Sequence, residues 1–201
     1  MRARYCAVGL LFTFACANAE ESPTPRTLAI LFHFEQPYAD RTLQETEREL
    51  KALIGEHAIK LEWHDRRDFE GKSTFANIVV LNFRGNCDPR SDSSFSGPMD
   101  SWLARMDVFD GVVLPFGEVN CGLMRALMAG GAHNAKLTDK EFGRALARVL
   151  AHELYHFLTQ STSHATQGLE KPAFSRADLL LDGLRLDRQE LGHLSQSILS
   201  R

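Results

Sequence analysis

The residues best suited to chemistry are two histidines and a glutamate in the segment His152-Glu153-Leu154-Tyr155-His156, which has the spacing H-E-x-x-H. On a helix, residues four apart lie one turn apart on the same face, so the imidazoles of His152 and His156 can reach one metal ion. Zinc lowers the pKa of a bound water toward neutrality, and Glu153 is placed to take the proton from that water. The pattern therefore predicts one catalytic Zn2+ and a hydrolytic reaction with Glu153 as general base.

A third ligand is expected as well, because a catalytic zinc usually has three protein ligands and one water. His164 lies just beyond the Ser-Thr-Ser stretch at 161–163, where a chain that leaves a helix can turn back toward the metal. We therefore expect His164 to complete the ligand set. Three carboxylates farther along the chain stay open as alternatives: Glu170, Asp178 and Asp182. Asp178 is also suited to capping a helix, and Asp182 to facing solvent.

The segment lies in the strongest predicted helix of the chain, from Thr138 to Gln160. Thr138 is followed three residues later by Glu141, which fits a capping box at the start of a helix. Apolar residues follow at helical spacing: Phe142, Leu146, Val149, Leu150, Leu154, Phe157 and Leu158. Two histidines and a glutamate within such an apolar stretch point to a functional site, because unpaired buried polar groups are costly.

Upstream of this helix, the periodicity of apolar residues predicts four elements. They are an apolar strand over 28–34, a surface amphipathic helix over 39–56, a half-buried strand over 59–63 and a uniformly apolar strand over 78–83. A polar loop over 85–98 follows them. Two short runs, 102–108 and 112–119, flank Asp110-Gly111, and this turn signal predicts a β-hairpin.

Two further helices are predicted on either side of the long one. The first is a short helix over 121–128, and the second is a final helix capped by Ser175 that includes Leu179, Leu180 and Leu184. This order of elements predicts an α/β (α+β) fold. We expect a mixed twisted sheet of about five strands, one amphipathic helix and the long H-E-x-x-H helix lying against the sheet.

The N-terminal segment differs from the rest of the chain. Two arginines precede an apolar run over 5–17, and Ala17-Asn18-Ala19 has small residues where a signal peptidase cleaves. Export from a bacterial cell, to the periplasm or the medium, is therefore expected. The pattern divides the chain into three parts: a signal peptide over 1–19, a flexible leader over 20–26 and a single domain over 27–201.

Export changes the interpretation of the cysteines, because disulfides persist in oxidising compartments. Cys87 and Cys121 are the two that stay in the mature chain. They are expected to form one disulfide, and two free, partly buried thiols are the alternative. Neither lies in a C-x-x-C pair, so we do not expect them to bind zinc.

The composition is that of an ordinary globular chain, with 201 residues, 44% hydrophobic and 24% charged residues, and a net charge of -3. This length is ample for one hydrophobic core. A charge balance of this kind offers no concentrated basic surface, so no nucleic-acid partner is expected. No apolar run reaches the roughly eighteen residues that a transmembrane helix needs.

The segment over 149–180 resembles the active-site segment of small exported bacterial metallopeptidase-like proteins related to the metzincins. In those proteins the H-E-x-x-H helix runs into a loop with a Ser-His pair, matched here by Ser163-His164. A Gly-Ile-Met turn follows there, matched by Gly168-Leu169-Glu170, and the segment over 114–121 resembles the strand end of the same group. The resemblance implies a metzincin-like fold, one zinc ion and a peptide or protein substrate.

Two departures from the metzincin pattern H-E-x-x-H-x-x-G-x-x-H concern the rest of the site. Thr159 stands at the position of the glycine, and His164 comes two residues later than the third histidine of that pattern. Glu170 stands where the turn has methionine. The motif and the resemblance favour a zinc metallopeptidase that binds an extended peptide along a strand of the hairpin. The departures leave an alternative, a catalytically inactive, zinc-stabilised binding or structural protein of the cell envelope.

Overall fold

The computed structural model describes residues 26–54, 59–71, 74–75, 77–91, 102–130 and 137–199, and the predicted signal peptide lies outside these ranges. In chain order the elements are β1 (Arg26–Phe34), α1 (Asp40–Ile54), β2 (Ile59–Asp65), β3 (Asn77–Arg84), β4 (Ala104–Phe109), β5 (Val112–Asn120), α2 (Cys121–Ala129), α3 (Asp139–Thr159), the 3-10 turn η1 (Gly168–Glu170), α4 (Arg176–Leu180) and α5 (Arg188–Leu199). β1 thus begins at the last residue of the predicted leader.

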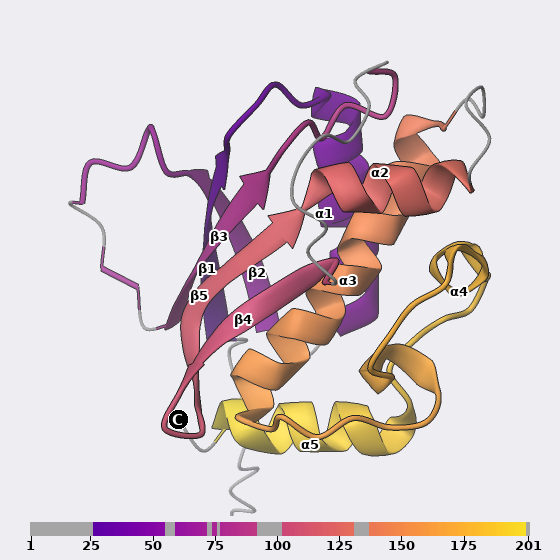
Figure 1. Cartoon of the computed structure of the whole chain (residues 1–201). Helices are drawn as coiled ribbons and strands as arrows, with labels where there is room; N and C mark the ends of the chain where they lie inside the picture. The colour runs from indigo at the N-terminus through magenta and orange to yellow at the C-terminus, as the bar shows by residue number, and fades with distance from the viewer. Residues whose placement is uncertain are drawn as a thin grey trace, which may run out of the picture.

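Five strands form one mixed sheet in the order β2-β1-β3-β5-β4 (Figure 1). The pairs β1–β2, β1–β3 and β3–β5 are parallel, whereas β4 runs antiparallel to β5 and forms one edge of the sheet. β1 lies inside the sheet between β2 and β3, and its residues from Leu28 to Phe32 are buried on both faces, as the apolar run predicts for a parallel strand. The predicted α/β fold with about five strands is confirmed.

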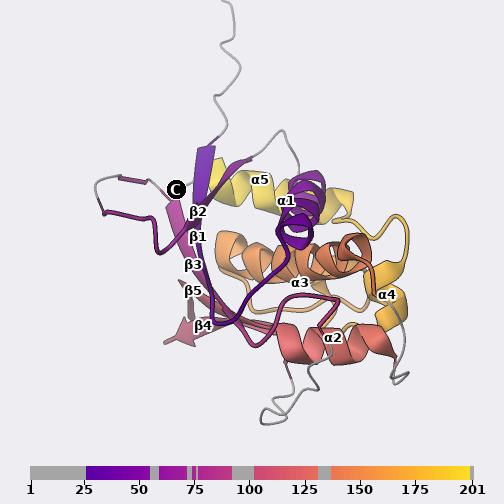
Figure 2. The same cartoon turned by 90° about the horizontal axis from the view of Figure 1, so that it is seen from above.

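The helices cover one face of this sheet (Figure 2). α1 and α3 pack against each other, and Gly143 of α3 makes their close approach possible. A Cβ atom at Gly143 would lie 2.6 Å from Glu45 Cβ and 2.8 Å from the Thr42 carbonyl oxygen of α1. Among the described helices, none is long and apolar enough to span a membrane.

The hairpin of β4 and β5 forms at the predicted turn and extends beyond the other strands (Figure 1). Asp110 and Gly111 have φ of 49° and 75°, the left-handed conformations that Asp-Gly favours in a tight hairpin. The β4–β5 register shifts between Met106 and Val108, so the strand carries a local irregularity there. Met106 is buried in the core, whereas Val108 is 52% exposed.

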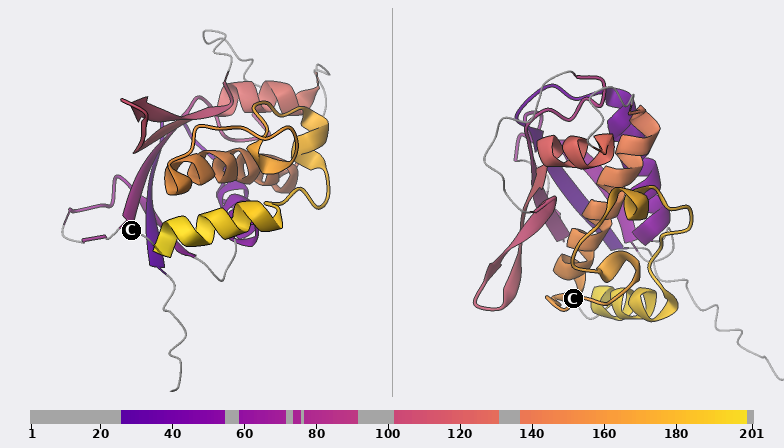
Figure 3. Two further views of the ribbon diagram at one scale, coloured as in Figure 1. Left: turned by 90° about the horizontal axis from the view of Figure 1, so that it is seen from below. Right: turned by 45° about the vertical axis from the view of Figure 1, so that its right-hand side comes forward.

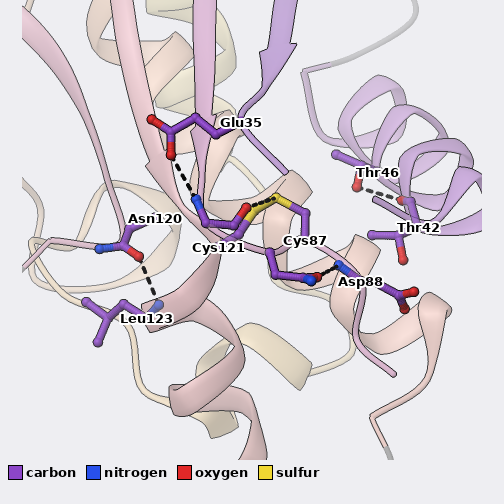
Figure 4. The surroundings of a disulfide bond; sticks show 10 residues. Glu35, Thr42, Thr46, Cys87, Asp88, Asn120, Cys121 and Leu123 are labelled. Carbon is purple, nitrogen blue, oxygen red and sulfur yellow. Dashed lines mark hydrogen bonds between the residues drawn. A yellow bond between two sulfur atoms is a disulfide. The ribbon is translucent and has the colours of Figure 1, made fainter. Parts of the chain in front are cut away.

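The predicted disulfide joins Cys87 to Cys121 in the structure, with a Cα–Cα distance of 5.1 Å (Figure 4). Both cysteines are fully buried. Cys87 follows β3 and Cys121 begins α2, whose first turn is capped by the Asn120 side chain accepting from the Leu123 N–H. The bond therefore ties the loop after β3 to the junction of β5 and α2.

The C-terminal part corrects one prediction. Ser175 caps α4 as expected, but the helix ends at Leu180, and Leu184 lies outside it. Gly183 has a φ of 86°, a conformation that a helix does not contain, so the chain turns there. A further helix follows, α5, which the apolar pattern did not reveal and which packs against α3 (Figure 3).

Candidate metal centre

Helix α3 carries the H-E-x-x-H motif and is buried along most of its length. Its first turn is fixed by a capping box, in which the Thr138 hydroxyl accepts from the Glu141 N–H and the Glu141 carboxylate accepts from the Thr138 N–H. Every residue over 145–158 is buried, and the helix lies against the sheet with α1 on one side and α2 on the other (Figure 2). The two histidines of the motif, His152 and His156, are each 7% exposed.

A backbone carbonyl orients each of these two histidines. His152 Nδ1 lies 2.6 Å from the Leu169 carbonyl oxygen, and His156 Nδ1 lies 2.6 Å from the Ser161 carbonyl oxygen. Because a carbonyl oxygen can only accept, each Nδ1 must carry the hydrogen and donate it. The other ring nitrogen, Nε2, then offers a lone pair in both rings as long as they are neutral.

The two Nε2 atoms face each other at a distance of 3.0 Å. Burial lowers the pKa of His152 to about 4 and also lowers the pKa of His156, so both rings are neutral near pH 7. Two lone pairs at this distance repel each other unless a cation lies against both. Tetrahedral zinc with Zn–N bonds of about 2.0–2.1 Å holds two nitrogens about 3.3 Å apart. The donor pair therefore fits zinc.

A third histidine, on the loop after α3, completes the cluster. Ring nitrogens of His152, His156 and His164 all lie within 4.8 Å of one another. The rings of His164 and His152 are nearly parallel, with centroids 5.2 Å apart, and the centroid of the His156 ring lies 4.9 Å from that of His164. His164 is exposed, whereas the other two are buried. Three imidazoles that reach solvent on one side form a donor set that leaves a position for water.

One short segment both carries His164 and orients His152. The Ala165 N–H donates to the Glu170 carbonyl oxygen at 3.0 Å, which closes the loop that begins at His164. The Leu169 carbonyl that holds His152 lies inside this loop. Partners of this kind fix the tautomer and the direction of a ligating ring.

Glu153 is buried beside His152 on α3, with 8% of its surface exposed. Burial raises the pKa of its carboxyl group to about 7, and a hydrogen bond from the backbone of Met106 opposes this shift. A carboxyl group that titrates near neutrality can both take and return a proton at physiological pH. Since Met106 belongs to β4, the edge strand of the sheet lies directly against this carboxylate.

Two of the alternative carboxylates are engaged elsewhere. Asp178 accepts from the backbone N–H and the hydroxyl of Ser175 and pairs with Lys171. Asp182 pairs with Arg144 at 2.8 Å, and its side chain is 94% exposed. Within the part of the chain that the structure describes, the group able to hold a metal ion consists of histidines and includes no carboxylate.

The third alternative, Glu170, lies next to the motif but contacts Tyr155. Tyr155 is 5% exposed. Burial is the larger cause of its raised pKa, and a hydrogen bond with the Glu170 carboxylate is the next largest. One oxygen of Glu170, Oε1, is buried without a hydrogen-bond partner. The Glu170 charge also raises the pKa of His156, against the larger effect of burial. The residue at the methionine position is therefore anchored to α3 through a phenol.

Sequence reasoning missed the groups that orient the motif, because most of them are main-chain atoms. The carbonyls of Leu169 and Ser161 and the N–H of Met106 carry no signature in residue type. Phe174 was also missed, although its ring packs edge-on against His152 with centroids 5.6 Å apart. The sequence signal that could have indicated Phe174 was its position as a single aromatic residue in a polar stretch.

Comparison with known proteins gives a match at the level of the fold. No protein-family profile matches the sequence, and no curated protein matches it. Among solved structures, the chain is similar to the crystal structure of archaemetzincin from Methanopyrus kandleri, with 12% sequence identity and a TM-score of 0.50. The match covers 88% of this chain and 97% of that chain. The protein therefore has a metzincin-like fold.

Proposed function

We propose that this protein is a zinc-dependent peptidase in which His152, His156 and His164 hold the metal and Glu153 is the general base. The observation that carries the proposal is the pair of Nε2 lone pairs 3.0 Å apart, with His164 beside them. The likeness to archaemetzincin supports it at the level of the fold. When bound, Zn2+ would supply an activated water and polarise the scissile carbonyl.

The protein's own residues have separate tasks in this reaction. Glu153, with its pKa near 7, takes a proton from the attacking water and returns it to the leaving amine. The carbonyls of Leu169 and Ser161 hold the Nδ1 hydrogens of the two buried histidines, so their Nε2 atoms keep one direction throughout. Both carbonyls belong to the segment that follows α3, so this segment helps to position the two histidines for catalysis.

The edge strand β4 is the proposed binding site for an extended peptide. It pairs with β5 on one side and forms the edge of the sheet on the other, and a sheet edge can accept another strand. Met106 of β4 contacts the Glu153 carboxylate through its backbone. A peptide added to β4 would therefore pass close to the general base.

Metal analysis of the protein and of the His152→Ala, His156→Ala and His164→Ala variants tests the metal site. We expect about one zinc per wild-type chain and weaker binding in all three variants, by roughly 10-fold or more. His193→Ala is the matched control, because His193 is exposed on α5 and lies outside the metal-binding group. A wild-type protein that binds no zinc would contradict the proposal.

Cleavage of a peptide library tests the reaction. The Glu153→Gln variant keeps the shape of the side chain and should retain zinc, while its kcat/KM falls by roughly 100-fold or more because the general base is lost. Equal activity of this variant and the wild type would exclude Glu153 as the base. Zinc binding with no cleavage by the wild type would favour the inactive, zinc-stabilised binding protein.

We also propose that the chain is exported, with residues 1–19 removed. The buried Cys87–Cys121 disulfide supports this, because such bonds persist in oxidising compartments. Sequencing the N-terminus of the protein recovered from the bacterial envelope or medium tests it. A mature chain that still begins at Met1 would contradict it.

A further inference from the structure

Gln160 joins the end of α3 to the β4–β5 hairpin. Its Oε1 accepts from the Val113 N–H at 3.1 Å, and its Nε2 donates to the Val113 carbonyl oxygen at 2.9 Å. The same Nε2 lies 2.8 Å from the Phe157 carbonyl oxygen, in the last turn of the helix. The side-chain amide thus engages both main-chain groups of one β5 residue and is itself held by the helix.

The backbone of Gln160 is unusual in a way that serves this contact. Gln160 is the C-cap of α3 and has a φ of 56°, in the left-handed region. Residues other than glycine enter this region at a cost, and asparagine and aspartate do so most readily. A glycine there would end the helix more easily but would provide no side chain to reach β5.

Beyond the contact with Gln160, the tip of the hairpin makes little contact with the hydrophobic core. Phe109 and Val112 flank the turn and are 74% and 52% exposed. Val113, by contrast, is 2% exposed and pairs with Val108 across the hairpin. The contact with Gln160 therefore falls at the last buried position before the exposed tip.

Two contacts with α3 then fix the hairpin relative to the metal centre. One joins Met106 of β4 to Glu153, and the other joins Val113 of β5 to Gln160. Gln160 is followed directly by Ser161, whose carbonyl orients His156. The Gln160 side chain thus contacts the hairpin, while the backbone of the next residue contacts a ligand of the proposed metal.

We propose that Gln160 is a positioning residue that holds the edge strand β4 alongside the metal centre, so that an extended peptide bound to β4 lies over Glu153. The inference rests on the proposed peptidase function for its catalytic part. Its structural part, the attachment of the hairpin to α3, stands on the Gln160 contacts alone.

The Gln160→Asn variant tests the attachment. Asparagine keeps the amide and tolerates the left-handed backbone, but it is one methylene shorter and cannot reach Val113 and Phe157 together. Amide hydrogen exchange over residues 104–116 should become about tenfold faster in this variant, because the loss of these bonds lets the hairpin open locally. Thr159→Ala is the matched control, because it removes only the bond from the Thr159 hydroxyl to the Tyr155 carbonyl.

Zinc content and peptide kinetics distinguish positioning from a general loss of structure. In Gln160→Asn we expect zinc content like that of the wild type, KM for octapeptides raised about fivefold at nearly unchanged kcat, and unchanged cleavage of dipeptide amides too short to pair with β4. Unchanged exchange over 104–116 would overturn the proposal, and so would equal effects on long and short substrates. If the wild type cleaves no peptide, the peptidase function fails, and the exchange result alone decides whether Gln160 holds the hairpin.

Discussion

His152 Nε2 and His156 Nε2 lie 3.0 Å apart on consecutive turns of α3, with both Nδ1 hydrogens already donated to carbonyls. Two lone pairs forced together in this way store repulsion that a bound cation relieves. The folded protein should therefore bind zinc much more strongly than the unfolded chain does. The consequence is a link between metal binding and folding.

Zinc is expected to raise the stability of the protein in a concentration-dependent way. At free zinc about 100 times its Kd, the free energy of unfolding should rise by about 2.7 kcal/mol. Thermal unfolding with buffered zinc and with a chelator measures the effect. His164→Ala, with binding at least roughly 10-fold weaker, should lose about half of the shift or more, and His193→Ala should keep it. Equal Tm values with zinc and with chelator in the wild type would contradict the link.

The disulfide is expected to contribute strongly to stability. It joins cysteines 34 residues apart, and a cross-link of that span stabilises the folded chain by about 4 kcal/mol, largely by restricting the unfolded chain. The variant in which both Cys87 and Cys121 are replaced by alanine should lose an amount of this order in urea unfolding. Adding reductant should lower the stability of the wild type toward that of the variant and leave the variant unchanged. A wild type insensitive to full reduction would contradict the expectation.

Much of the fold could be predicted because its signals are local. The capping box at Thr138, the Asp110-Gly111 turn and the alternating or uniform apolar runs each act within a few residues of themselves. The helix that begins after Ser175 shows where prediction from local signals fails. Its predicted continuation through Leu184 depended on apolar spacing, but Gly183 turns the chain, and Leu184 is buried without being helical.

The convergence of the three histidines was predictable only in part, for a physical reason. The spacing of His152 and His156 is set by one helix, so their convergence follows from helical geometry. The position of His164 depends on a loop closed by a bond between Ala165 and Glu170, and its sequence has no pattern that specifies such a bond. The contact between Gln160 and Val113 joins residues 47 apart in the sequence and was therefore not visible at all.

Gly143→Ala should destabilise the protein, because α1 leaves no room for a side chain there. The added Cβ would lie 2.6 Å from Glu45 Cβ and 2.8 Å from the Thr42 carbonyl oxygen, so the two helices must separate. We expect a loss of about 1–3 kcal/mol in the free energy of unfolding, as is typical of overpacking. Gly192→Ala on α5 is the control, since nothing lies within 4 Å of a Cβ there. That control should be neutral or gain about 0.5–1 kcal/mol, and equal effects of the two changes would contradict the packing argument.

Asp178 should make stability fall at low pH. Hydrogen bonds from Lys171 and then from Ser175 lower the pKa of its carboxyl group from 3.8 to about 2 in the folded protein. A group with a lowered folded pKa contributes stability above its unfolded pKa and loses it as pH falls through the folded value. The contribution should therefore be complete above about pH 5, mostly lost at about pH 2 and absent near pH 1. Because the side chain is partly exposed, solvent screening keeps it modest.

Urea unfolding of the wild type and of Asp178→Asn at several pH values between 2 and 7, all with chelator, measures this contribution. The asparagine keeps an acceptor for the Ser175 N–H but carries no charge, so the difference in free energy of unfolding should shrink steadily between about pH 4 and pH 2. Asp182→Asn is the control, because the Asp182 side chain is 94% exposed and its pair with Arg144 lies at the surface. A difference that stays constant over this range would contradict the lowered pKa of Asp178 and the contribution of its charge to folding.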